Sequence, residues 1–325
     1  MQALICAKFG MPETLHLCEI PTPIPGPKQV LVMVEACGVN FPDTLIIQDK
    51  YQFKPELPFS PGGELVGKVI VCGKEVSDFQ VGDYVLGLSG WGGMAEKALV
   101  DEDRVFALPK DIPAETAAAT LYTYATSLYA LKDRGGLKSG ETLLVLGAGG
   151  GIGLAAVELG KLMGAKVIAA ASSVDKLAAA KAKGADLTID YTEEDLKTRI
   201  KELTDGEGVD VVLDPVGGSY TEQALRGMAW GGRYLVVGFA QGEIPKMPMN
   251  LPLLKGCSIV GVFWGNFSRK EADKNRENLN QLMNWISEGK IQKPVVSKYS
   301  LKEAPKALRA MMDRKLVGKA VVVLN

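Results

Sequence analysis

The stretch Thr142–Gly153 reads TLLVLGAGGGIG, and LAAVELGKLM follows it directly over residues 154–163. An apolar run of strand length that breaks into glycines and restarts with helical periodicity predicts a strand, a tight turn and a helix in succession. In such a turn one glycine makes the bend, one lets the backbone approach a pyrophosphate, and one lets helix and strand pack closely. The first amides of the helix then hold the phosphate. We therefore expect a dinucleotide-binding βαβ unit to begin here.

The spacing departs from a strict G-x-G-x-x-G, because Ala148 stands in the first slot, before Gly150 and Gly153. The context supports the interpretation all the same. Lys166–Ala171 reads KVIAAA and lies at the distance expected for the second strand of the unit. The alternative, a flexible glycine linker, does not explain this flanking periodicity.

Length and composition restrict the possible classes of protein. At 325 residues the chain exceeds what one hydrophobic core usually supports, so two domains are expected. The balance of Lys+Arg 37 against Asp+Glu 38 argues against a nucleic acid or a membrane surface as partner. The five cysteines never occur as C-x-x-C, so neither a disulfide framework nor a zinc cluster is predicted. Without an apolar span or a leader, we expect a cytoplasmic protein, or one of an organelle matrix if a targeting peptide was removed.

The first part of the chain is predicted to be mostly β. Short strands separated by glycine- and proline-rich turns favour a small, curved barrel or sandwich. The expected strands are Gln2–Lys8, Gln29–Ala36, Leu65–Val71, Asp83–Leu88 and Met94–Val100. The alanine-rich segment Ala114–Ala130 is predicted to be helical, with an interruption near Thr123, and to form the hinge between the domains.

From Thr142 onward, strands and helical segments alternate, which predicts a parallel sheet covered on both faces. The expected strands begin at Thr142, Lys166, Asp186, Val209 and Arg233, and a further strand covers Ser258–Trp264. After an amphipathic helix at Lys270–Glu288, strands at Val295–Tyr299 and Ala320–Leu324 flank a helix at Lys302–Asp313. This tail is expected to rejoin the N-terminal domain, which gives a substrate domain over 1–122, a nucleotide domain over 123–262 and a return over 263–325.

The end of the second strand favours NADP(H) over NAD(H). NAD-binding folds carry an acidic residue about twenty residues past the glycine turn, where it binds the ribose diol. Here Ser172 and Ser173 follow the strand instead, with Lys176 as a counter-charge for a 2′-phosphate, and Tyr191 is expected along the adenosine. The alternatives are that Lys176 is merely solvated and that Ser173 is only a helix N-cap.

Further motifs cover almost the whole chain. They are Gly38–Asp43, Tyr51, Pro61–Gly67, Val81–Asp83, Tyr124–Thr126, Asp214–Gly218, Val237–Phe239, Leu253–Gly256, Phe263–Gly265 and Gly318–Val322. Together with the glycine turn, this set resembles the medium-chain dehydrogenase/reductase superfamily, and within it the zinc-independent quinone oxidoreductase branch. The resemblance implies an α/β fold, in which a Rossmann doubly wound parallel sheet is inserted into a GroES-like β-barrel-type catalytic domain. It also implies a cleft between the two domains and a homodimer or homotetramer, often joined through the Rossmann sheets.

No metal site is predicted. Zinc-using relatives carry cysteine where this chain has Asn40, and histidine where it has Gly63. The four-cysteine structural lobe is absent as well, and the single histidine, His16, is expected to be a strand residue. A catalytic zinc needs three protein ligands, which this sequence does not supply.

Without zinc, the resemblance implies hydride transfer from NADPH to an acceptor that is already electrophilic, either a quinone or an α,β-unsaturated carbonyl compound (an enone). Hydrogen-bond donors aimed at the acceptor oxygen would lower the barrier. The resemblance assigns Asn40, Asp43, Tyr51 and Tyr124 to catalysis. The alternatives are that Asn40 only caps the segment from Phe41 and that Asp43 is a structural acceptor. Water is an adequate source of the proton.

The glycine turn, the ends of the second and third strands and the resemblance together predict a set of cofactor contacts. It comprises Phe41, Thr126, Gly150, Gly151, Ile152, Gly153, Ser172, Ser173, Lys176, Tyr191, Val216, Gly217, Gly238, Phe239, Phe263, Trp264, Gly265 and Lys319. Thr126 is expected beside the nicotinamide, and Lys319 near the phosphates. Taken singly, Phe239, Phe263 and Trp264 also fit as core aromatics.

The sequence is compatible with three functions. The first is an NADPH-dependent reductase of quinones or enones, whose partner is a small molecule. The second is an enoyl-CoA or enoyl thioester reductase, for which a cationic entrance is expected. The third is a catalytically weak NADPH-binding protein, and the neutral charge balance disfavours an RNA-binding role for it.

Overall fold

The computed structural model describes residues 1–324, which form two compact units. Unit 1 comprises Met1–Tyr122 and the tail from Pro294 onward, and unit 2 comprises Thr123–Lys293. The second passage between the units therefore comes later than the expected boundary after Val262. The reason is packing, because the segment beyond Val262 belongs to unit 2: the rings of Phe267 and Tyr129 stack with their centroids 4.0 Å apart.

Unit 1 is mostly β, as expected. Its strands are β1 (Gln2–Ile5), β2 (His16–Glu19), β3 (Gln29–Gly38), β4 (Glu64–Cys72), β5 (Tyr84–Gly87), β6 (Lys97–Asp101), β7 (Val105–Ala107), β14 (Val296–Ser300) and β15 (Lys319–Val323). Its helices are η1 (Pro12–Thr14), α1 (Phe41–Ile46), η2 (Glu102–Arg104), η4 (Leu301–Glu303) and α10 (Ala304–Met312). β1 pairs with β2, and a larger sheet has the order β14-β15-β3-β4-β5-β7, with β6 also paired to β3.

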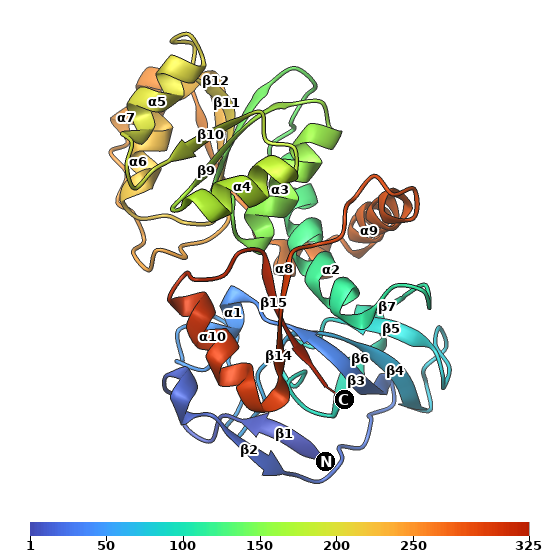
Figure 1. The fold of residues 1–325 in the computed structure, drawn as a ribbon. Helices are drawn as coiled ribbons and strands as arrows, with labels where there is room; N and C mark the ends of the chain where they lie inside the picture. Colours follow the sequence, from blue (N-terminus) through green and yellow to red (C-terminus); the bar gives the residue numbers. More distant parts are fainter. Residues whose placement is uncertain (325) are drawn as a thin grey trace. The chain divides into compact units, whose positions relative to one another are not determined.

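The C-terminal tail completes the larger sheet of unit 1. β15 pairs antiparallel with β3 and parallel with β14, so Figure 1 shows red strands beside blue ones. The expected return of the tail to the N-terminal domain is thus confirmed. Alternate residues Val30, Val32 and Val34 of β3 are buried against Leu65 and Val85, which is the period of two that a strand facing a core requires.

Unit 2 contains the parallel sheet. Its strands are β8 (Thr142–Leu146), β9 (Lys166–Ala171), β10 (Leu187–Asp190), β11 (Val209–Asp214), β12 (Met228–Val236) and β13 (Ser258–Gly261). The order β10-β9-β8-β11-β12-β13 is that of the Rossmann fold, in which the order reverses beside the first strand. The predicted doubly wound parallel sheet is therefore confirmed.

Helices cover both faces of this sheet. They are α3 (Gly151–Leu162), α4 (Val174–Ala182), α5 (Leu196–Leu203), α6 (Ser219–Arg226) and α7 (Asn250–Lys255). Two further helices of unit 2, α8 (Trp264–Lys270) and α9 (Ala272–Ser287), follow β13 and pack against each other. α3 and α4 lie together on one face, while α5, α6 and α7 lie together on the other (Figure 1). The central strands β8, β9 and β11 are almost fully buried, which explains why their sequences read as continuous apolar runs rather than alternating ones.

Two local predictions were wrong. The helix α2 (Ala114–Leu128) runs through Thr123 without interruption and continues into a π-helical turn at Tyr129–Arg134. The strand expected to extend to Trp264 ends at Gly261, because Trp264 begins α8 with its side chain buried.

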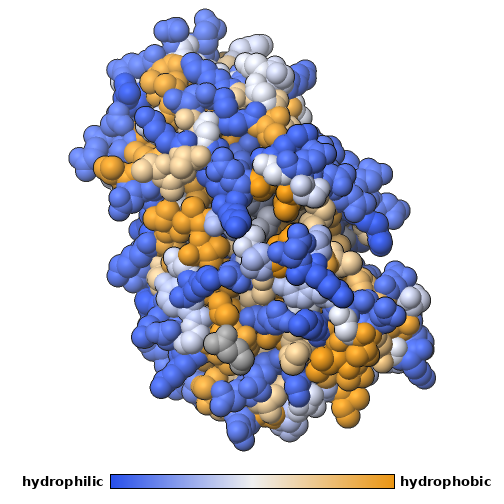
Figure 2. Space-filling model, turned by 45° about the vertical axis from the view of Figure 1, so that its right-hand side comes forward, coloured by the Kyte–Doolittle hydropathy of each residue, from blue (hydrophilic) through white to orange (hydrophobic). Residues whose placement is uncertain are grey.

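Within residues 1–324, no helix combines the length and the apolarity that a membrane crossing requires. On the face drawn in Figure 2, hydrophilic residues separate the apolar ones into several clusters. On this face the apolar residues therefore do not form one continuous large patch.

Candidate functional site

The glycine turn after β8 is tight at one position and open at another. A Cβ on Gly153 would overlap the carbonyl oxygen of Gly147 and lie 2.6 Å from Cα of Ala148. A Cβ on Gly150 would meet nothing closer than the Gly147 oxygen at 3.6 Å. Glycine is therefore required at 153 for packing of helix on strand, while the space beside Gly150 is left open for a ligand.

The N-terminus of α3 points its first amides at this open space. The first N–H groups of any helix have no acceptor within the helix, and here they belong to Gly151, Ile152 and Gly153. Together with the helix dipole they form a binding site for an anionic group.

Beside the turn, the carboxyl end of β9 is polar and carries a cation. The Lys176 ammonium donates to the Ser172 hydroxyl at 3.0 Å, and Ser173 caps α4 by accepting from the Lys176 N–H at 3.5 Å. The stem of Lys176 lies directly over Gly149, where a Cβ would overlap it. Tyr191, at the end of β10, packs its ring 4.2 Å from that of Tyr220. Lys176 thus connects the polar end of β9 with the glycine turn, while Tyr191 lies at the end of the neighbouring strand.

The loop after β11 is held by a buried carboxylate. Asp214 accepts from the N–H groups of Val216 and Gly217, both at 2.8 Å, and from the hydroxyls of Thr221 and Tyr234. Gly217 has φ +70° and packs against Phe239, so glycine is required there. Asp214 therefore sets the course of a loop that carries two of the predicted cofactor contacts.

A buried hydroxyl in α2 lacks a partner. The Oγ1 atom of Thr126 is buried and makes no hydrogen bond with any residue that the structure describes. Buried polar atoms are almost always paired, so such an atom calls for an explanation. A ligand group at this point of unit 2 would satisfy it.

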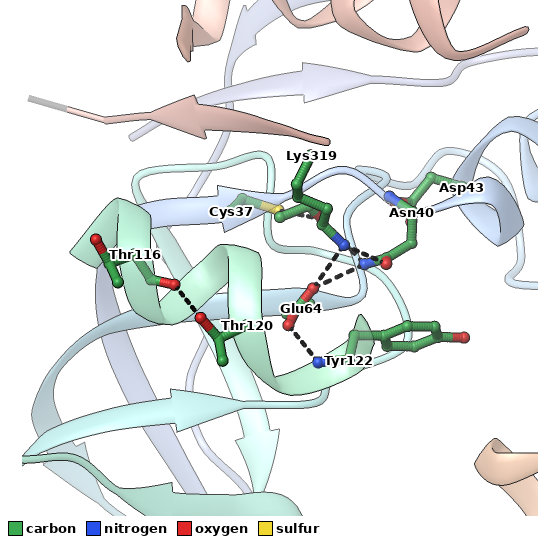
Figure 3. A network of polar contacts seen from close by, with 9 residues as sticks. Cys37, Asn40, Asp43, Glu64, Thr116, Thr120, Tyr122 and Lys319 are labelled. Atoms are coloured by element: carbon green, nitrogen blue, oxygen red, sulfur yellow. Dashed lines mark hydrogen bonds and ion pairs between the residues drawn. The ribbon is translucent and has the colours of Figure 1, made fainter. Parts of the chain in front are cut away.

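Unit 1 holds the second cluster, which Figure 3 shows in close-up. Asn40 precedes α1, Glu64 begins β4, Lys319 begins β15, and Tyr122 lies in α2. They meet beside Gly38, where a Cβ would overlap the carbonyl oxygen of Ala118 and lie 2.6 Å from Glu64 Oε2. The missing side chain at Gly38 is what lets the carboxylate and α2 approach the end of β3.

Hydrogen bonds fix the orientation of the Asn40 amide. Its Oδ1 accepts from the Lys319 ammonium, while Nδ2 donates to Gly38 O at 3.2 Å and to Glu64 Oε2 at 3.0 Å. Asp43 accepts from the Asn40 N–H at 2.7 Å, which fastens the start of α1. Both amide hydrogens of Asn40 are therefore already used within unit 1.

Comparison with known proteins places these two units in a family. An alcohol dehydrogenase GroES-like domain matches residues 26–110, and a zinc-binding dehydrogenase domain matches residues 151–288. The quinone oxidoreductase-like protein 2 homolog of Nematostella vectensis is 40% identical over 99% of this chain and 88% of its own length. The chain belongs to the quinone oxidoreductase-like branch of the medium-chain dehydrogenase/reductase family.

Two solved structures resemble the whole chain. A mycobacterial protein in complex with NADPH is 31% identical with a TM-score of 0.94, and the match covers 99% of this chain and 100% of the mycobacterial one. Escherichia coli quinone oxidoreductase in complex with NADPH is 29% identical with a TM-score of 0.93, again over 99% and 100%. The family resemblance and the fold read from the sequence are thereby confirmed.

Although one family domain is named for zinc, the donors of this quinone oxidoreductase-like chain do not fit a zinc ion. Within residues 1–324, no group of three His, Cys, Asp or Glu side chains lies close enough to bind a metal. Beside Glu64 lies the Lys319 ammonium at 3.0 Å, a cation that would repel another cation. Asn40 and Gly63 offer no thiolate or imidazole.

Three predicted site residues of this family member bind other side chains of the chain. Tyr124 donates its hydroxyl to the buried Glu158, and Lys183 lies beside that hydroxyl, so Tyr124 is built into the interior of unit 2. Trp264 is buried and donates to Asn275 at 2.9 Å, as a core residue does. Lys319 is buried in unit 1, where its ammonium donates to Asn40 and Glu64.

The remaining predicted residues lie at strand and helix ends. Phe41 begins α1, Phe263 precedes α8 and is partly exposed, Gly265 lies in the first turn of α8, and Gly238 follows β12. His16 lies in β2, as expected.

Sequence reasoning missed Tyr122 and the two buried pairs Lys319–Glu64 and Lys183–Glu158. Lys319 lies 255 positions from Glu64, and Lys183 lies 25 positions from Glu158, so neither pair forms a local pattern. The only available hint was that charged residues occur inside apolar segments, as Glu158 does within α3.

The carboxyl of Asp43 is expected to make the stability of unit 1 depend on pH. Burial raises its pKa to about 6, although the N–H of Asn40, the Lys319 ammonium and the N–H of Gly62 each lower it, and the Glu64 charge raises it. The folded state therefore binds more protons than the unfolded chain between about pH 4 and 6. In this window the free energy of unfolding should fall by up to about 3 kcal/mol as pH rises.

Urea unfolding of the wild type and of Asp43→Asn, measured from pH 4 to 7, checks this. The asparagine still offers an oxygen to the Asn40 N–H but cannot lose a proton. The wild type should lose stability relative to the variant up to about pH 6 and then stay level. Equal slopes for the two proteins would show that Asp43 does not titrate in this range.

Proposed function

We propose that this protein is an NADPH-dependent reductase that transfers hydride to a quinone, or to the activated double bond of an α,β-unsaturated carbonyl compound, without zinc. The observation that carries the cofactor assignment is the Lys176–Ser172 contact beside the open glycine turn. A 2′-phosphate at this place would meet a cation and two hydroxyls instead of a carboxylate. The solved relatives in complex with NADPH support the same assignment.

Different residues of unit 2 would bind the different parts of the cofactor. The amides of Gly151 and Ile152 would hold the pyrophosphate, and Tyr191 would lie along the adenosine. The unpaired Thr126 hydroxyl and the loop of Val216 and Gly217 would bind the nicotinamide end. When bound, NADPH supplies the hydride, and the protein orients it.

On the substrate side, the chain must stabilise negative charge on the acceptor oxygen. We propose Tyr51 as a donor, since a phenol stays protonated near neutral pH. Asn40 and Asp43 keep the start of α1 in place, because their hydrogen bonds are made within unit 1. Tyr124 is excluded from the donors because its hydroxyl is bound to Glu158. Water supplies the proton that completes the reduction.

Replacing Lys176 by alanine should weaken NADPH binding while leaving NADH binding nearly unchanged. The loss of one charge-assisted contact to a phosphate is worth about 1.5 to 3 kcal/mol, roughly tenfold or more in Kd. Calorimetric titration of both nucleotides measures it. The control is Lys181→Ala, a charge removed from an exposed position of the same helix. Equal losses for NADPH and NADH would contradict a 2′-phosphate contact.

The reaction itself is tested by following NADPH oxidation with a naphthoquinone, a 2-alkenal and a short enoyl-CoA. Turnover of the first two supports the proposal. Preference for the thioester would identify an enoyl thioester reductase instead. Tight NADPH binding without turnover of any acceptor would identify a catalytically weak NADPH-binding protein.

We further propose a homodimer, joined through the β13 edge of unit 2. β13 has a neighbour on one side only, and its residues are largely exposed. Near this edge Trp230 is 80% exposed and packs beside Gly256, close to the exposed Leu253 and Leu254 of α7. A free strand edge next to exposed large apolar side chains favours association. Sedimentation should give twice the chain mass, or four times in a tetramer.

A further inference from the structure

Each unit contains one buried lysine–glutamate pair. In unit 1 the Lys319 and Glu64 side chains are 4% and 0% exposed, and in unit 2 those of Lys183 and Glu158 are 4% and 6% exposed. Burying such a pair costs desolvation energy that its attraction only partly offsets. The pair in unit 1 lies in the cluster that we assign to the substrate side, which raises the question of what it positions there.

The Glu64 carboxylate connects three elements through its two oxygens. Oε2 accepts from Lys319 of β15 and from Asn40 before α1, both at 3.0 Å. Oε1 accepts from the backbone N–H of Tyr122 in α2 at 2.8 Å. Since Lys319 also binds the Asn40 oxygen, these contacts form a closed network, drawn with dashed lines in Figure 3.

This network sets the place of the Tyr122 side chain. Its backbone is held by Glu64, and its ring lies 5.6 Å from the Lys319 ammonium, within the range of a cation–π contact. In Figure 3 the ring extends away from the Glu64 carboxylate, with its hydroxyl at the far end. A tyrosine held at both its backbone and its ring is oriented before any ligand arrives.

The surroundings keep the Tyr122 phenol protonated. Burial raises its pKa, and the nearby Tyr51, Asp43 and Glu64 groups raise it further. A phenol with a raised pKa donates a hydrogen bond but does not readily give up its proton. Tyr51, the donor proposed above, is one of these neighbours.

We propose that Tyr122 is a further hydrogen-bond donor to the carbonyl oxygen of the acceptor, and that Glu64 and Lys319 are its positioning residues. This inference rests on the proposed reductase function. When the β-carbon of an enone, or a quinone, accepts a hydride with its two electrons, the π electrons move onto the carbonyl oxygen. Tyr122 stabilises that charge without transferring its proton, and water protonates the anion to give the reduced product and NADP⁺.

Removing the phenol should affect the acceptor and leave the cofactor alone. Tyr122→Phe is expected to lower kcat/KM for the acceptor by about 100-fold, at the lower end of what one lost donor costs. Its Kd for NADPH should stay within twofold of the wild type. Binding of naphthoquinone to the NADP⁺-loaded protein, where no turnover occurs, should weaken severalfold.

Positioning by Lys319 is tested in the same assays. Lys319→Met should lower kcat/KM for the acceptor, and Tyr122→Phe should cost little more in that background, because the ring is already misplaced. Lys183→Met is the matched control, since it breaks an equally buried pair in unit 2. If Lys319→Met fails to fold, Lys319→Ala with added propylammonium, which replaces the missing atoms, should recover acceptor turnover.

The outcomes separate the inference from the function on which it rests. Wild-type acceptor binding and turnover in Tyr122→Phe would overturn the inference. If kcat/KM for the acceptor falls no further in Lys319→Met than in Lys183→Met, Lys319 does not position Tyr122. Lack of NADPH oxidation by the wild type would refute the proposed function, and the naphthoquinone binding measurement would still decide whether Tyr122 contacts the acceptor.

Discussion

Gly150→Ala is expected to abolish tight NADPH binding while the protein keeps its stability. The backbone of Gly150, with φ −87° and ψ 171°, is one that alanine adopts without strain. Its Cβ would meet no protein atom closer than 3.6 Å, so folding is not disturbed. The methyl group would instead fill the space where the pyrophosphate must approach the backbone. We expect Kd to rise at least about 100-fold, roughly 3 kcal/mol.

Two other glycines provide the controls for this experiment. Gly153→Ala should lower both NADPH affinity and stability, because its Cβ overlaps the backbone of Gly147 and Ala148 just after β8. Gly261→Ala in β13 should leave NADPH affinity unchanged, since no atom of the chain lies within 4 Å of a Cβ there. Calorimetric titration and thermal unfolding of the three variants give the comparison. NADPH binding by Gly150→Ala equal to that of the wild type would mean that the cofactor does not use this turn.

Glu158→Ala is expected to destabilise unit 2 strongly. Glu158 accepts from Lys183 at 2.9 Å, from the N–H of Gln292 at 2.8 Å and from the Tyr124 hydroxyl. Its removal leaves the buried Lys183 ammonium with only neutral acceptors, among them the Lys293 carbonyl at 3.3 Å. Breaking one partner of such a pair costs about 3 to 5 kcal/mol.

The exposed pair of Lys298 and Glu115 is the matched control. Lys298 Nζ lies 2.5 Å from Glu115 Oε1, and the two side chains are 59% and 29% exposed. Glu115→Ala should therefore cost less than about 1 kcal/mol of stability. Urea unfolding followed by tryptophan fluorescence suits the comparison, because Trp264 and two of the other three tryptophans lie in unit 2. The double variant Glu158→Gln/Lys183→Met should regain much of the loss, since no buried charge remains. Equal costs for the exposed and buried glutamates would contradict this account of unit 2.

The glycine turn shows how far the sequence alone could lead. The separate tasks of Gly150 and Gly153 follow from their spacing after an apolar strand, and the open and closed spaces in the structure agree with them. The alternation of strands and helices likewise predicts a parallel sheet, because parallel strands need crossover connections.

The contacts of the substrate side were harder to predict from the sequence, because the side chains that make them come from distant parts of the chain. Asn40 suggested a donor by its residue type, yet its partner Lys319 lies 279 positions away, and that partner takes its oxygen. Tyr122 and Tyr124 are two positions apart in one helix and therefore point in different directions. No local pattern predicts that Tyr122 binds Glu64 through its backbone N–H while Tyr124 binds Glu158 through its hydroxyl.

The central claim is that the chain passes hydride from NADPH to an acceptor without a metal. The most direct measurement is the initial rate of NADPH oxidation with a naphthoquinone, before and after exhaustive treatment with a metal chelator, and with NADH in place of NADPH. The account predicts equal rates before and after the chelator, and kcat/KM for NADH at least about tenfold lower. Loss of activity with the chelator and its recovery with zinc, or no oxidation of NADPH at all, would contradict it.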